Sequence, residues 1–188
     1  RSTLFPYTTL FRSSKNHRQQ VLLRLEGSIE SKDQELEKLR NDRKQLEELL
    51  KAVEQSLADI KLPDTALPIE QLKGRLRWPT NGSLAHRFGS RNQLTGERWK
   101  GVLIDASEGK DVVALHHGRV IFADWLRGFG LLLIIDHGSG YMSLYGHNQV
   151  LYREVGDWVE PNEVVAGVGN SGGRSQSGLY FEIGRAHV

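Results

Sequence analysis

The chain contains no cysteine, which excludes disulfides and thiolate metal sites but does not fix the cellular compartment. It also lacks any apolar run near the ~20 residues of a membrane-spanning helix. Positive and negative charges nearly balance, since the chain has 25 Lys and Arg residues and 23 Asp and Glu residues, for a net charge of +2. Because no base-stacking or groove-reading motif accompanies this balance, we do not expect a nucleic-acid partner. The hydrophobic share of 38% is ordinary for a globular protein.

Both ends of the chain look foreign to the protein. Residues 1–13 and 184–188 contain stretches that read back into codons as sequencing-adapter sequence, so we exclude them from fold reasoning. Glu182 and Ile183 are ambiguous, because adapter and protein sequence coincide there. The true N-terminus is therefore missing, and the lack of a leader peptide says nothing about location.

Residues 14–62 have the pattern of one long helix. Apolar residues recur every three or four positions over about five heptads, with Glu, Lys and Arg on the outer faces. So narrow a stripe predicts a coiled coil that needs a partner helix, although a single amphipathic helix packed on its own domain stays open. The seam comprises Leu22, Leu25, Ile29, Leu36, Leu39, Leu46, Leu50, Val53, Leu57 and Ile60.

Pro63 ends this helix, and residues 63–78 read as a linker. Within the linker, residues 69–73 predict a short helix that Gly74 closes.

Residues 79–183 change to short β-type runs separated by glycine turns. Seven strands in about a hundred residues predict an all-β sandwich or open barrel, so the whole chain is expected to be α+β. The run 131–135 is apolar on both faces and should form a central strand. The expected strands are 101–106, 112–114, 119–123, 131–136, 142–145, 164–168 and 179–183.

Two of these runs, W-K-G-V-L from Trp99 and G-L-Y-F-E-I from Gly178, carry a family resemblance. They resemble the metal-binding strands of the LytM (lysostaphin-type) zinc peptidases, which read H-x-G-[IV]-D and H-L-H-F-E. In this register the ligand positions hold Trp99, Leu103, Gly178 and Tyr180. A catalytic zinc needs about three N, O or S ligands. These side chains do not supply them, so we expect no catalytic residue, no metal and no cofactor.

Degenerate LytM domains of this kind include murein hydrolase activators, and that resemblance sets the functional expectation. It implies a periplasmic protein that activates N-acetylmuramoyl-L-alanine amidases of the AmiA and AmiB type when septal peptidoglycan is split during cell division. It also implies a coiled coil operated by the FtsEX transporter, although most of that coiled coil is missing here.

An emptied zinc cleft lined by apolar and aromatic groups suits an amphipathic helix of a partner. We therefore predict a partner-binding groove, partly by matching positions of the family. Leu132 and Tyr145 as core residues, and Lys100 as a solvated charge, remain the simpler interpretations. The predicted groove consists of Trp99, Lys100, Leu103, Phe129, Leu132, Tyr145, His147 and Tyr180.

Two other functions stay open from the sequence. His147 occupies the place of the peptidase's catalytic histidine, so an active zinc endopeptidase with unusual ligands such as His86 and His147 is one alternative. A passive peptidoglycan-binding module is the other.

Overall fold

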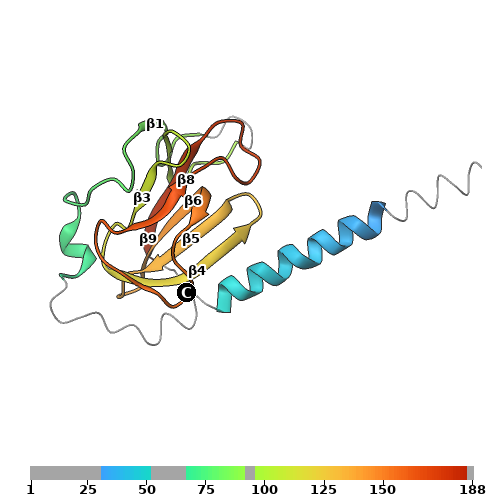
Figure 1. Cartoon of the computed structure of the whole chain (residues 1–188), viewed down its shortest axis with the longest axis horizontal. Coiled ribbons are helices and arrows are strands. Elements are labelled where there is room, and N and C mark those ends of the chain that lie inside the picture. The colour runs from blue at the N-terminus through green and yellow to red at the C-terminus, as the bar shows by residue number, and fades with distance from the viewer. Residues whose placement is uncertain (1–30, 52–66, 92–95, 186–188) are drawn as a thin grey trace, which may run out of the picture. The chain divides into compact units, whose positions relative to one another are not determined.

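The computed structural model describes residues 31–51, 67–91 and 96–185, which form a mostly β fold with one N-terminal helix (Figure 1). The helix occupies residues 31–51 and lies inside the predicted helical segment. Four leucines of its predicted seam each keep half or more of their surface exposed, namely Leu36, Leu39, Leu46 and Leu50. Residues 14–30 and 52–62 lie outside the described residues, so the coiled coil remains a prediction. In the described part of the chain, no helix combines the length and apolarity needed to cross a membrane.

The described residues from 67 onward form one short 3-10 helix and nine strands. The 3-10 helix η1 covers Ile69–Leu72, where the sequence predicted a short helix over 69–73. The strands are β1 (Ser83–His86), β2 (Val102–Asp105), β3 (Asp111–Val113), β4 (Gly118–Leu126), β5 (Gly130–Asp136), β6 (Tyr141–Leu151), β7 (Trp158–Val159), β8 (Val164–Val168) and β9 (Gly178–Arg185).

Each of the seven predicted strands is present, and β1 and β7 are additional. The four residues of β1 are all exposed, so no buried alternation marks them as a strand. Strand β7 has only two residues, which is too short for any pattern. These two strands form through pairing with β2 and β4, not through their own sequence.

The sheet is antiparallel throughout and runs in the order β1-β2-β9-β6-β5-β4-β7, with β8 pairing both β6 and β3 (Figure 1). Strand β5 lies between β6 and β4, which confirms the central position predicted from its apolar run. Strands β2 and β9, about 75 residues apart in the sequence, are direct neighbours.

Alternate residues of β5 serve two apolar clusters on opposite faces of the sheet, as the period of two requires. Leu133 and Ile135 belong to a larger cluster with residues of β3, β6, β8 and β9. Leu132 and Ile134 belong to a smaller cluster with Ile121, Phe122 and Met142. The larger cluster is the core that holds the fold together, and the smaller one lies on the face that carries the candidate site.

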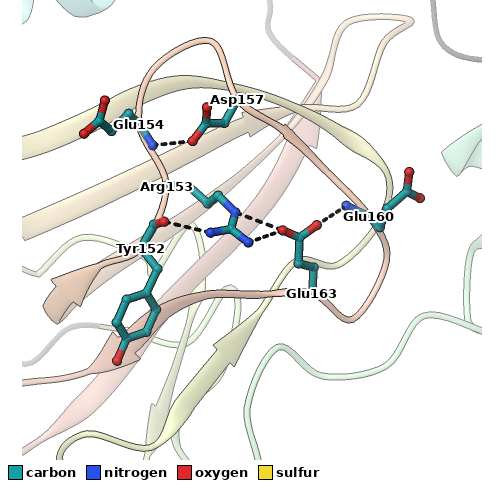
Figure 2. Close-up of polar contacts among 6 residues, drawn as sticks. All are labelled: Tyr152, Arg153, Glu154, Asp157, Glu160 and Glu163. Atoms are coloured by element: carbon teal, nitrogen blue, oxygen red, sulfur yellow. Dashed lines mark hydrogen bonds and ion pairs between the residues drawn. The ribbon is translucent and has the colours of Figure 1, made fainter.

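The loop from β6 through β7 to β8 is held by side-chain bonds (Figure 2). The Arg153 guanidinium donates two hydrogen bonds to Oε1 of Glu163, and the other oxygen of Glu163 accepts the Glu160 amide at 2.7 Å. The Glu160 amide and Arg153 together lower the pKa of the Glu163 carboxyl. A further bond joins the Glu154 amide to Asp157 at 2.9 Å. This bracing fixes the turn at residues 160–162.

Candidate functional site

The two family-like motifs meet in the structure because β2 and β9 pair directly. Leu103 lies opposite Tyr180, and Asp105 lies opposite Gly178. Glycine is needed at position 101, since a Cβ there would lie 2.4 Å from the Phe181 carbonyl oxygen and 2.8 Å from Cζ of Tyr180. The backbone can therefore approach the Tyr180 ring, which lies at the centre of the site.

Five rings, that of Tyr180 among them, form what we call the aromatic cluster: His86, Trp99, Phe129, His147 and Tyr180. The His86 ring stacks on Trp99, with centroids 4.6 Å apart and planes 9° from parallel. The Tyr180 centroid is 6.3 Å from Trp99, 5.4 Å from Phe129 and 6.3 Å from His147. Because β1, β6, β9 and two loops all contribute a ring, the cluster depends on the whole fold.

The Tyr180 hydroxyl donates a hydrogen bond to Oε2 of Glu182 at 2.7 Å. Burial, this hydrogen bond and the nearby negative charge all raise the pKa of Tyr180. The phenol therefore stays neutral and oriented toward Glu182, which sequence reasoning left aside as possible adapter sequence.

Burial separates the predicted groove residues into two layers. Leu103 and Leu132 are each 1% exposed and lie beneath the surface. Tyr180 and His147 are nearly as covered, at 6% and 7%. Trp99 and Phe129 are half-buried, and Lys100 is exposed. The accessible members of the predicted groove are therefore Lys100, Trp99 and Phe129.

Tyr145 does not lie with the other predicted groove residues. It is opposite Leu133 in the β5–β6 register and belongs to the larger core, where its ring packs 5.4 Å from Phe181. Its hydroxyl accepts the Leu115 amide at 2.9 Å and lies 2.9 Å from the Ser143 hydroxyl. With no exposed surface, Tyr145 supports the core, which corrects its assignment to the groove surface.

His147 has an unusual backbone, with φ of 64° in the left-handed region. Its Nδ1 lies 2.9 Å from the Ser171 carbonyl oxygen, and its amide donates to the Phe129 carbonyl oxygen. Burial lowers the pKa of His147, and the charge of Arg174 lowers it further. The imidazole is therefore held neutral and in a fixed orientation beside Tyr180.

The residues at the family's ligand positions do not fit a zinc ion. Leu103 and Gly178 supply no donor atom, and the phenol of Tyr180 already donates its proton to Glu182. The two alternative histidines are not paired with each other, because His86 stacks on Trp99 whereas His147 packs against Tyr180. Across the described ranges, no three His, Cys, Asp or Glu side chains are grouped to hold a metal.

Sequence reasoning missed two charged residues near the site. One carboxylate oxygen of Asp105 is buried without a hydrogen bond among the described residues. The Arg174 guanidinium lies close enough for the Asp105 charge to counter the burial that lowers the Arg174 pKa. Asp105 follows Leu103 by two residues on the same strand, and that spacing is the signal that could have revealed it.

Comparison with known proteins places this site in a family. Residues 97–188 match the model of peptidase family M23. The chain therefore carries a domain of peptidase family M23.

Among curated proteins, the murein hydrolase activator EnvC of Escherichia coli is 51% identical over 114 residues, which cover 60% of this chain and 27% of that protein. The murein hydrolase activator NlpD of Salmonella typhimurium is 37% identical over 108 residues, covering 57% of this chain and 27% of that protein. The chain thus spans about a quarter of the length of these relatives. Its domain is EnvC-like, and the LytM-type resemblance is confirmed.

Among solved structures, the catalytic domain of lysostaphin from Staphylococcus simulans superimposes with a TM-score of 0.54 at 21% identity. The match covers 57% of this chain and 83% of that one. At this identity the likeness establishes the fold alone.

Proposed function

We propose that this protein is a non-catalytic activator of periplasmic N-acetylmuramoyl-L-alanine amidases in septal peptidoglycan splitting. In this proposal the metal-free LytM surface binds the regulatory helix of the amidase. The curated relatives are named murein hydrolase activators, which supports activation of a murein hydrolase in general. That amidases are the hydrolases activated is our finer proposal.

The observation that carries the proposal is the exchange of zinc ligands for the aromatic cluster. Aromatic rings supply a large contact area at little cost in conformational entropy, and they are frequent in binding hot spots. Trp99 and Phe129 keep part of their rings accessible, and Leu103 and Leu132 give the surface an apolar support. An amphipathic helix buries an apolar face of this kind.

Lys100 adds a charge at the edge of this surface. It is exposed and follows Trp99 directly, so an acidic residue of the incoming helix could reach it. Such a contact at a rim mainly steers association and selects partners. We further propose that the helical segment links the domain to FtsEX, as the resemblance to murein hydrolase activators implies.

The test is stimulation of a purified amidase on dye-labelled peptidoglycan by the chain restored at both termini. Tyr180→Ala and Lys100→Glu are each expected to reduce stimulation at least tenfold. The matched controls are Tyr152→Ala, an exposed tyrosine, and Lys110→Glu, an exposed lysine, both outside the aromatic cluster. They are expected to stimulate like the unsubstituted chain.

Circular dichroism of each variant separates loss of binding from loss of fold. Normal stimulation by both Tyr180→Ala and Lys100→Glu would overturn the proposed surface. Stoichiometric zinc, or digestion of peptidoglycan without added amidase, would instead favour a zinc endopeptidase. Binding to sacculi with no effect on any amidase would favour a passive wall-binding module.

A further inference from the structure

A pocket of ≈ 570 Å³ lies near the start of β4, where η1, the turn before β4 and the turn at 160–162 meet. This volume is in the usual range for sites that bind small ligands. The lining combines an aliphatic part with two arginines and two histidines. Its residues are Leu67, Leu72, Arg75, Leu76, Arg77, Leu115, His116, His117, Glu160, Pro161 and Asn162.

The two histidines form a fixed part of the wall. Nε2 of His116 lies 2.9 Å from the Leu67 carbonyl oxygen, and the His117 ring stacks on Trp158 at 5.4 Å. Both are more than nine-tenths buried. His117 Nδ1 is 3.3 Å from Oε2 of Glu160, while its Nε2 is buried with no hydrogen bond in the described structure. The pocket therefore has a preorganised polar wall.

The opposite turn is also rigid, because the network of Figure 2 ends there. Glu163 binds the Glu160 amide and Arg153, and the Asn162 amide donates to the Ala114 carbonyl oxygen at 2.9 Å. Glu160 is thus held beside His117 without any ligand. A site whose walls are already ordered loses little entropy when it binds.

The charge of the pocket favours an anion. Neither Arg75 nor Arg77 has an ion pair within the described ranges, and the nearby acid of η1, Glu70, is bonded to Arg185 at 3.1 Å. Glu160 is the single acidic residue of the lining, and it lies beside His117. Arginine suits carboxylates, because its fork of N–H groups can donate to both oxygens.

The apolar part of the lining narrows the ligand further. Leucines and a proline offer contact for short aliphatic groups, whereas the lining contains no Trp, Tyr or Phe on which a sugar or a base could stack. We propose that this pocket binds the terminal carboxylate of a short peptide with small aliphatic side chains. Arg75 and Arg77 take the carboxylate, and the leucines contact the side chains.

This site is separate from the aromatic cluster. His117 directly precedes β4 and Phe129 follows it. The first and last of the nine residues of β4 are roughly 26 Å apart, at about 3.3 Å for each of the eight steps between them. The two lining sets share no residue. A peptide bound in this pocket would therefore leave the proposed amidase-binding surface unoccupied.

The probe is a murein tetrapeptide, whose terminal alanine has this chemistry, and that choice rests on the proposed murein context. Calorimetric titration into the full chain is expected to give a Kd below about 1 mM. The peptide with its terminal carboxylate amidated, and the variant Arg75→Ala/Arg77→Ala with the free peptide, should each bind at least tenfold more weakly. The charge-matched control Arg87→Ala/Lys110→Ala removes two exposed cations elsewhere and should bind normally.

Absence of binding at millimolar peptide would overturn the site, and so would equal weakening by the two double variants. Amidase stimulation by Arg75→Ala/Arg77→Ala is expected to stay normal, so failure of the pocket and failure of the proposed function are distinguishable. Unchanged thermal unfolding of the double variant would show that its weaker binding is not a loss of fold.

Discussion

Tyr145 and Tyr180 lie close together on two adjacent strands, yet they face opposite sides of the sheet. Tyr145 lies on β6 in the larger core, with no exposed surface and a hydroxyl bonded to the Leu115 amide. Tyr180 lies on β9 in the aromatic cluster, with a hydroxyl bonded to Glu182. The sequence had placed both tyrosines in the predicted partner-binding groove. The difference shows that a shift of one residue along a strand decides whether a tyrosine side chain packs in the larger core or in the aromatic cluster.

The largest expected effect comes from removing each ring in turn. Tyr145→Ala should lower the free energy of unfolding by about 4 kcal/mol, because it leaves a cavity in a closed core and unpaired polar groups. Tyr180→Ala should cost about 2 kcal/mol, since its cluster borders solvent and can relax. Urea denaturation of both variants measures the difference. Equal losses would mean that the aromatic cluster is as much a part of the core as Tyr145.

The pH dependence of the free energy of unfolding tests the same comparison in the core that contains Tyr145. His137 is fully buried, with Nε2 2.7 Å from the Ser143 hydroxyl that contacts Tyr145 and Nδ1 2.9 Å from the His117 carbonyl oxygen. Burial lowers the pKa of His137 to about 4. Between pH 6.5 and 4 the unfolded chain therefore binds more protons than the folded one, so stability is full above pH 6.5 and falls as the pH drops.

The expected loss from His137 is about 3 kcal/mol between pH 7 and 4, from about 1.4 kcal/mol for each unit of pKa difference. Urea denaturation at a series of pH values measures it. His137→Asn should flatten the profile, whereas His86→Asn, in the aromatic cluster, should leave it steep. Carboxylates and His147 also lower the stability of the folded state as the pH drops. The informative quantity is therefore the difference between the pH profiles of the His137→Asn variant and the unsubstituted chain. A profile unchanged by His137→Asn would contradict the assigned burial.

The sequence predicted the strands that have their own apolar pattern, including the central position of β5. It could not predict β1 or β7, because pairing with neighbours creates them. For the site, the paired motifs placed Leu103 beside Tyr180 correctly, since both lie within short strands that pair in register. Tyr145 was assigned to the groove, although a core position was the simpler interpretation, because the sequence run does not show which face of β6 packs in the larger core.

Contacts between charged residues from separate segments of the chain were also not predicted. Arg174 approaches Asp105, and Arg153 binds Glu163, only after the chain has folded. Charges in separate segments have no periodicity to connect them. The pocket between η1 and the turn at 160–162 was missed for the same reason, because its walls come from three parts of the chain.

The smallest expected effect comes from removing only the two hydroxyl groups. Tyr145→Phe keeps the ring but leaves the buried Leu115 amide without its acceptor, which should cost about 1–3 kcal/mol. Tyr180→Phe loses a bond to the partly exposed Glu182, which water can replace, so its cost should stay below about 1 kcal/mol. Urea denaturation separates the two values. If Tyr180→Phe also keeps normal amidase stimulation while Tyr180→Ala does not, the ring and not the hydroxyl makes the proposed contact. A larger stability loss for Tyr180→Phe than for Tyr145→Phe would contradict the roles given to the two faces of the sheet.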